Sequence, residues 1–232
     1  MSLALSALAL GVLHGLGADH LMAIAAMSVG GSSMEAGSLD PARRTRVVQT
    51  AVGFASGHAL VLGFGAVVAV LFGVALPAAV SSGAERVGGA TLVALGMAGF
   101  WTVLVGRAYG HLHRDGAPPA AWHVHVGLRS GHPAGGHAHS SLPTAIGAIF
   151  AVSSLRALML LQPFGADARA MALPGLLLLI VLFGLGILLS MSVFGLLLAR
   201  VLSIRAIERF GQAAAALVAL ASTGLGMYWM LG

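Results

Sequence analysis

Long apolar stretches separated by shorter polar ones run through this 232-residue sequence. A helix needs about 20 apolar residues to cross a hydrocarbon core of about 30 Å. A transmembrane barrel would instead show short segments of alternating polarity. The pattern therefore predicts an all-α, polytopic helical membrane protein with about six transmembrane helices. We expect these spans at residues 3–28, 47–73, 86–106, 143–163, 173–199 and 207–230.

The composition supports this fold class. Only 8% of the residues are charged, whereas a soluble domain has about 25% charged residues, so a soluble globular domain is excluded. All twelve basic residues are arginines, and we attribute the high isoelectric point to loop arginines that set the topology, with no nucleic-acid binding. The chain has no cysteine, which excludes disulfides, thiolate metal sites and dithiol redox chemistry.

The arginines predict the orientation of the chain. The connections after the first, third and fifth spans hold most of them, and arginine-rich loops face the cytoplasm. We therefore expect a multi-pass protein of the cytoplasmic (inner) cell membrane with both termini outside. The first apolar run lacks a basic leader and a convincing cleavage site, which favours a retained span. The arginines of these connections are Arg43, Arg44, Arg46, Arg107, Arg114, Arg129, Arg200 and Arg205, against Arg86 and Arg169 on the other side.

An internal repeat is visible at the starts of two spans. Residues 85–90 read ERVGGA, and residues 208–213 read ERFGQA. Three spans per half is an odd number, so the halves would have opposite orientations, as in many transporters. A chance similarity between two helix starts is the alternative. We expect a first transmembrane half at 1–110, a histidine-rich loop at 111–141 and a second half at 142–232.

Ionisable residues interrupt the apolar pattern in two neighbouring spans. His14, Asp19 and His20 lie in the first span, and His58 lies in the second. A charged residue inside a membrane costs roughly 2.5–3.5 kcal/mol on insertion scales, so such residues usually line a cavity, pair with one another or bind something. Neutral imidazole and carboxylate are ligands of divalent transition metals. The alternative is that these side chains only form hydrogen bonds between helices.

The first three of these residues cannot converge on a straight helix. At about 100° per residue, His14 lies roughly 140° from Asp19 and roughly 120° from His20. Gly15 and Gly17 lie between them, and glycine allows the backbone to leave helical geometry at modest cost. We therefore expect a break that turns all three groups towards one point. The alternative role of these glycines is close packing between helices.

The motif His14-x-x-x-x-Asp19-His20 resembles the signature of the nickel/cobalt transporter family (NiCoT, within the NicO superfamily). Its context, HGLGADHL, is most similar to the shorter, urease-accessory-type members. Gly57-His58 resembles a second family motif, and residues 182–195 (LFGLGILLSMSVFG) resemble the later part of these proteins. The resemblance implies a secondary transporter or permease for Ni²⁺ or Co²⁺. It also implies His14, Asp19, His20 and His58 as the metal-binding positions.

The second half departs from the longer members of that family. Where those have an acidic, threonine-rich motif, residues 151–156 read AVSSLR. An arginine facing the site would repel a dication. We therefore expect Arg156 to reach the membrane interface or to pair with Asp19, or to have no role in the site.

Seven of the ten histidines lie between residues 111 and 139. Prolines and glycines make this segment a poor helix or strand. Imidazole suits Zn²⁺, Ni²⁺, Co²⁺ and Cu²⁺, so the segment is a candidate low-affinity chelator on the cytoplasmic side; a flexible linker is the alternative. The candidate ligands are His111, His113, His123, His125, His132, His137 and His139.

These observations favour transport over catalysis. No glutamate lies inside a span core, so the His-Glu-x-x-His arrangement of a metalloprotease is missing, and we expect no enzyme and no prosthetic group. The expected function is alternating access around a site for Ni²⁺ or Co²⁺, with Zn²⁺ as another candidate. The expected partners are the dication and the lipid bilayer. The alternative is a non-transporting accessory protein or sensor that binds nickel for urease or hydrogenase maturation proteins.

Overall fold

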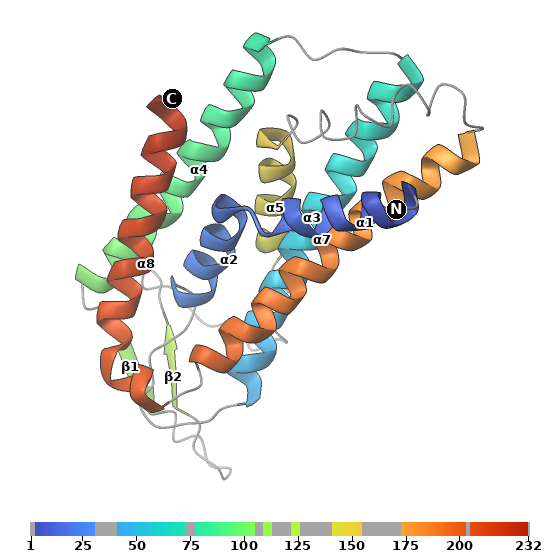
Figure 1. Ribbon diagram of the computed structural model, residues 1–232. Coiled ribbons are helices and arrows are strands. Elements are labelled where there is room, and N and C mark those ends of the chain that lie inside the picture. Colours follow the sequence, from blue (N-terminus) through green and yellow to red (C-terminus); the bar gives the residue numbers. More distant parts are fainter. Residues whose placement is uncertain are drawn as a thin grey trace.

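In the computed structural model, helices account for nearly all of the described chain (Figure 1). The structure describes residues 3–30, 41–72, 78–104, 109–112, 122–125, 141–154, 173–202 and 205–231. The helices in this part of the chain are α1 (Leu3–Gly15), α2 (Ala18–Gly30), α3 (Pro41–Phe72), α4 (Ala78–Leu104), α5 (Leu142–Ser153), α7 (Leu173–Leu202) and α8 (Arg205–Leu231). Two short strands, β1 (Tyr109–Leu112) and β2 (Trp122–His125), complete it.

Several of these helices are long and apolar enough to cross a membrane. Within the described residues these are α3, α7 and α8, or four spans if α1 and α2 are counted as one bent span. The helical, membrane-type fold agrees with the prediction, but this count does not establish six spans. Of the expected span at 143–163, the structure describes α5 and Ser154, and the remainder lies outside the described residues.

Helices from the two predicted halves pack against one another. In Figure 1, α8 runs beside α4, and α1 crosses α7. α3 packs against both α5 and α7, while α2 contacts the surrounding α3, α4, α7 and α8. The core that results contains fully or almost fully buried side chains from both halves: Ile24, Phe54, Leu62, Leu92, Phe150, Phe183, Ile187 and Met191.

Large apolar side chains also cover the outside of the helices. On α7, Leu178, Val181, Leu185 and Leu189 are each about half exposed. A water-soluble protein rarely exposes a continuous apolar face, whereas a membrane helix turns such a face to the lipid. The exposed leucines of α7 therefore agree with a transmembrane position.

The first predicted span is broken at its glycines. α1 and α2 meet at an angle of 52° across a short connection. The amide of Gly17 donates to the carbonyl of His14 at 3.0 Å, which closes the end of α1. The carbonyl of Gly17 accepts the amide of Leu21 at 3.1 Å, which begins α2. The expected departure from helical geometry therefore occurs between the two histidines of the first motif.

α1 packs on α7 through two reciprocal glycine contacts. A Cβ atom added at Gly11 would collide with the carbonyl oxygen of Phe183, and one added at Gly186 would collide with that of Leu8. On each helix the glycine follows the contacted carbonyl by three positions. The backbones approach so closely that only glycine fits at the crossing, as is common between membrane helices.

The packing of α5 on α3 has the same form. A Cβ atom added at Gly57 would collide with the carbonyl oxygen of Thr144, and one added at Gly147 would collide with that of Phe54. Again each glycine follows the contacted carbonyl by three positions. Two helix crossings that lie far apart in the sequence thus share one pattern of backbone contact.

The two strands form an antiparallel pair within the segment that we expected to be irregular. Tyr109 lies opposite His125, and His111 lies opposite His123. Tyrosine, tryptophan and valine in these strands favour extended structure. The expectation that this segment disfavours strands is thus wrong for residues 109–112 and 122–125.

Candidate metal centre

Three of the four histidines and acids predicted as metal ligands come together in the structure. His14 lies at the end of α1, His20 in the first turn of α2 and His58 in the middle of α3. One ring nitrogen from each lies within 4.8 Å of the other two. His20 and His58 are buried, and His14 is partly buried. The break between α1 and α2 therefore allows both His14 and His20 to lie next to His58 of α3.

One pair of ligand atoms has the spacing that a metal ion requires. The Nε2 atoms of His14 and His58 are 3.1 Å apart. Two nitrogens bound to one ion at about 2.0–2.1 Å are separated by roughly 2.9–3.4 Å at angles between 90° and 109°. The same pair can share one hydrogen bond when one ring donates. Two nitrogens on opposite sides of one ion are about 4.1 Å apart, which is the largest separation that the ion allows. The nitrogens of the cluster are up to 4.8 Å apart. Binding therefore requires one ring to move slightly closer to the others.

Asp19 lies beside this cluster and is not one of its three members. Its Oδ1 atom is 3.0 Å from Nδ1 of His20. Metal-binding histidines usually present their second nitrogen to a carboxylate, which fixes the tautomer and the orientation of the ring. Asp19 is positioned for that role. His20 is then left with Nε2 as its ligand atom.

Gly17 makes room for this arrangement. A Cβ atom added there would lie 2.6 Å from Nδ1 of His20 and 2.8 Å from Oδ1 of Asp19. Any larger residue at position 17 would displace the carboxylate or the imidazole. Gly17 therefore allows both the helix break and the close approach of the two side chains.

Ser154, at the end of α5, supplies one further polar contact. Its hydroxyl Oγ lies 3.2 Å from Nε2 of His20 and is buried. His58 Nδ1 is also buried, but it has no hydrogen-bond partner among the described residues. Native proteins rarely leave a buried nitrogen unpaired.

Aromatic rings surround the imidazoles. Phe183 stacks on His14 with ring centroids 5.8 Å apart, and Phe54 stacks on His58 at 6.0 Å. Phe150 lies 6.2 Å from His20. These apolar rings exclude water from one side of the cluster and hold the imidazoles in place. A low-dielectric wall of this kind strengthens the attraction between a cation and the nearby Asp19 carboxylate.

The remaining candidate ligands belong to the histidine-rich loop. The pairing of β1 with β2 sets His111 opposite His123, while His125 lies opposite Tyr109. The other candidates in this loop lie outside the described residues, namely His113, His132, His137 and His139. Arg156, beyond α5, also lies outside the described residues.

The sequence did not reveal all of the surroundings of the site. Phe54 lies four positions before His58 on one helix, a spacing that places two side chains on the same face, so this neighbour was predictable. The contact between His20 and Ser154 joins residues 134 positions apart. It depends on how α5 packs against the first half, and no local pattern signals it.

Comparisons with models of protein families, with curated proteins and with solved structures give no match to this chain.

Proposed function

We propose that this protein is a secondary transporter that moves Ni²⁺ or Co²⁺ across the cytoplasmic membrane. The observation that supports it best is the meeting of His14, His20 and His58 among helices apolar enough to span a membrane. A buried cluster of imidazoles in such surroundings is costly unless it binds something. Neutral imidazole suits Ni²⁺ and Co²⁺, and also Zn²⁺.

The number of ligands favours an ion that comes and goes. Structural metal sites usually close the coordination sphere with four protein ligands, whereas sites with three leave a position open. The described cluster offers three nitrogens, and Asp19 orients one of them. The open positions would hold water or an incoming ligand, so that the dication can be released.

The broken first span is a second argument for transport. Discontinuous helices with a binding site at the break are a recurring feature of secondary transporters. Here the break between α1 and α2 separates His14 from His20. A small rotation of α2 relative to α1 would therefore change the spacing of the ligands and with it the affinity for the ion.

We further propose that the chain has six spans arranged as two inverted halves. The crossings of α1 with α7 and of α5 with α3 share one pattern of glycine contacts. This pattern relates α1 to α5 and α7 to α3, which is the correspondence expected of an inverted repeat. Movement of one half against the other would open the site to each side of the membrane in turn.

The same correspondence leaves one metal site among the described helices. His14 follows Gly11 by three positions, and the equivalent residue after Gly147 is Phe150. The ring pair of Phe150 and Phe54, 5.5 Å apart, then corresponds to the pair of His14 and Phe183. Apolar rings thus replace the ligands in the second half, so the ion would bind to the first half alone.

We also propose that the chain belongs to the nickel/cobalt transporter family and that it has the topology predicted from its arginines. The arginine distribution places the histidine-rich loop in the cytoplasm and both termini outside. Loop histidines would then bind the ion weakly on the cytoplasmic side.

The test is metal flux into proteoliposomes that contain the full chain. We expect Ni²⁺ or Co²⁺ to enter, and we expect His14→Ala and His58→Ala to abolish this flux. Ser222→Ala is a control, because Ser222 is a buried polar residue of α8 and is not a member of the cluster. Binding without flux in the intact protein would indicate an accessory protein or sensor. Absence of both binding and flux would refute the proposal.

A further inference from the structure

Both ring nitrogens of His20 have a polar neighbour. Oδ1 of Asp19 lies 3.0 Å from Nδ1, and Oγ of Ser154 lies 3.2 Å from Nε2. Asp19 precedes His20 in the chain, whereas Ser154 follows the last residue of α5 and is 134 positions away. His20 and Ser154 are both buried. The second contact therefore joins α2 to the end of α5 at the candidate metal centre.

The direction of this hydrogen bond follows from the single proton of a neutral imidazole. Such a ring carries a proton on one nitrogen and a lone pair on the other. An ionised carboxylate only accepts hydrogen bonds, so Asp19 favours the proton on Nδ1. Nε2 is then the acceptor, and the Ser154 hydroxyl donates to it. The lone pair that accepts this hydrogen is the one that a metal ion needs.

The last turn of α5 sets the position of the hydroxyl. Phe150 and Ser154 are four residues apart, a spacing that places two side chains on one face of a helix. Both contact His20, the first with ring centroids 6.2 Å apart. The amide of Ser154 donates to the carbonyl of Phe150 at 3.0 Å, which keeps Ser154 in line with the helix. α5 therefore presents the hydroxyl to His20 from a defined place.

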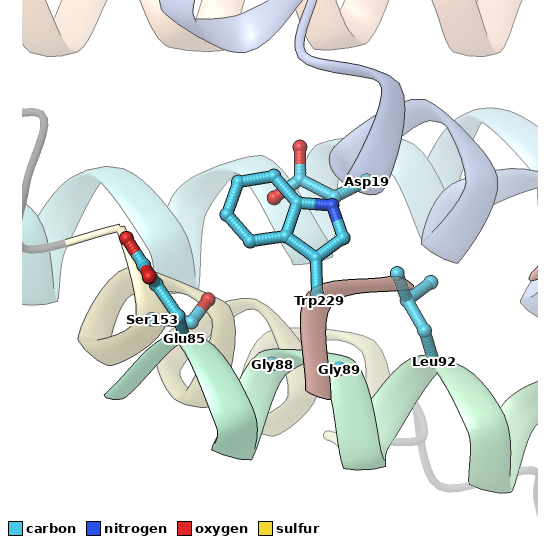
Figure 2. A pocket seen from close by; sticks show the side chains of 7 residues that line it. All are labelled: Asp19, Glu85, Gly88, Gly89, Leu92, Ser153 and Trp229. Atoms are coloured by element: carbon cyan, nitrogen blue, oxygen red, sulfur yellow. The ribbon is translucent and has the colours of Figure 1, made fainter. Parts of the chain in front are cut away.

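A small pocket borders the end of α5 (Figure 2). It is lined by residues of four helices, among them Ser153 of α5, Asp19 of α2, Glu85 of α4 and Trp229 of α8. Ser153 and Asp19 lie on different sides of it. It has room for about one water molecule. The end of α5 and the start of α2 are thus not fully packed at this point, which leaves space for a small shift.

We propose that Ser154 is a positioning residue that holds His20 while the site is empty and releases it when the dication binds. The inference rests on the proposed function, because the hydroxyl and the ion would compete for one lone pair. When the ion binds, the hydrogen bond from Ser154 to Nε2 breaks, Nε2 coordinates the ion, and the proton stays on the serine oxygen. α2 is thus tied to α5 without the ion, and to α1 and α3 with it.

This competition couples the ion to the contact between two helices. Two binding events that exclude each other weaken each other by the same factor. The ion therefore loosens α2 from α5, and the hydroxyl lowers the affinity for the ion. The Nε2 atoms of His14 and His58 are already 3.1 Å apart, so the ring that has to be freed is His20. On release of the ion, the hydroxyl takes the ring back.

Loss of the hydroxyl should therefore tighten binding. In Ser154→Ala the empty site lacks one hydrogen bond, and we expect the dissociation constant for Co²⁺ to fall about 2- to 12-fold. The spectrum of bound Co²⁺ should stay the same, because Ser154 is not a ligand. Ser154→Gly removes the same hydroxyl and should behave alike. Titration of the full chain in detergent measures the affinity and the spectrum together.

Ser153→Ala is the matched control. The Ser153 hydroxyl donates to the carbonyl of Phe150 at 2.7 Å, within its own helix. Its loss should leave the affinity for Co²⁺ at the value of the intact chain.

A measurement without metal tests the hydrogen bond itself. In protein labelled with ¹⁵N at histidine, the Nε2 resonance of His20 is assigned by its loss in His20→Gln. This resonance should move in Ser154→Ala and stay in place in Ser153→Ala, because acceptance of a hydrogen bond changes the chemical shift of a ring nitrogen.

The outcomes separate this inference from the proposed function. Weaker binding or a changed Co²⁺ spectrum in Ser154→Ala would overturn the inference and make Ser154 a ligand. An unchanged affinity would overturn it as well, since the hydroxyl would then not compete with the ion. An unmoved Nε2 resonance would show that the hydrogen bond is not formed. If the intact protein binds no Co²⁺, the proposed function itself fails.

Discussion

The Nε2 atoms of His14 and His58 face each other at 3.1 Å, although the two residues are 44 positions apart in the chain. Without an ion, one ring must donate to the other, and His20 stands within 4.8 Å as a third donor or acceptor. Three imidazoles alone cannot satisfy all of their nitrogens, and His58 Nδ1 has no partner among the described residues. A dication would order all three rings at once, because it accepts electron pairs from each of them.

Removal of one of these rings should abolish tight binding. For His58→Ala we expect the dissociation constant for Co²⁺ or Ni²⁺ to rise about 100-fold or more, since loss of an outer-shell partner alone costs about 10- to 100-fold. Isothermal titration of the protein in detergent measures it. His139→Ala, a substitution in the histidine-rich loop, is the control and should leave the tightest site unchanged. Equal affinities in His58→Ala and the intact protein would place the site elsewhere.

Asp19 should act through His20. Asp19→Asn keeps the size of the side chain but removes the charge that holds Nδ1 of His20, 3.0 Å away. We expect the affinity for the metal to fall about 10- to 100-fold, while the spectrum of bound Co²⁺ keeps the same number of nitrogen ligands. A change in the number of ligands would show that Asp19 binds the ion directly.

Gly17 should be intolerant of a side chain for a local reason. Gly17→Ala would push a methyl group to 2.6 Å from His20 Nδ1 and 2.8 Å from Asp19 Oδ1, so we expect weaker metal binding in a folded protein. Gly224→Ala is the matched control, because no atom lies within 4 Å of a Cβ atom added there. Titration with Co²⁺ compares the two. The idea fails if both variants bind as tightly as the intact chain.

These residues also show what the sequence alone can predict. The apolar helices follow from hydropathy, which sums local properties of the chain, and the break at Gly17 follows from the freedom of glycine. The meeting of His14 with His58 could be expected once the break was assumed. The contact of Ser154 with His20 and the pocket at Glu85 and Trp229 could not, because they depend on the crossing and rotation of helices that lie far apart in the sequence.

The histidine-rich loop should bind metal separately from the membrane site. Replacement of its seven histidines by asparagine is expected to remove weak sites in a titration and to leave the tightest site unchanged. The physical reason is that the three clustered histidines belong to α1, α2 and α3, and none belongs to the loop. A loss of the tightest site in this variant would contradict the assignment.

The glycine contacts should control the stability of the helix assembly. Gly57→Ala forces a methyl group against the carbonyl of Thr144, whereas Gly63→Ala on the same helix meets Ile180 Cγ2 at an ordinary 3.7 Å. Overpacking costs about 1–3 kcal/mol, which lowers the apparent melting temperature by about 2–4 °C per kcal/mol. Thermal unfolding followed by tryptophan fluorescence in detergent should show this loss for Gly57→Ala and little change for Gly63→Ala.

The equivalence of the two crossings extends this prediction to the other helix pair. If the crossing of α1 with α7 is equivalent to the crossing of α5 with α3, Gly11→Ala and Gly147→Ala should lower the stability of the protein by similar amounts. Each substitution introduces a methyl group against a backbone carbonyl that cannot move without its helix. The costs should also add when both are changed, since the crossings share none of their contact residues. A large loss at one crossing with tolerance at the other would mean that the two contacts are not equivalent, and the inverted arrangement would lose its support.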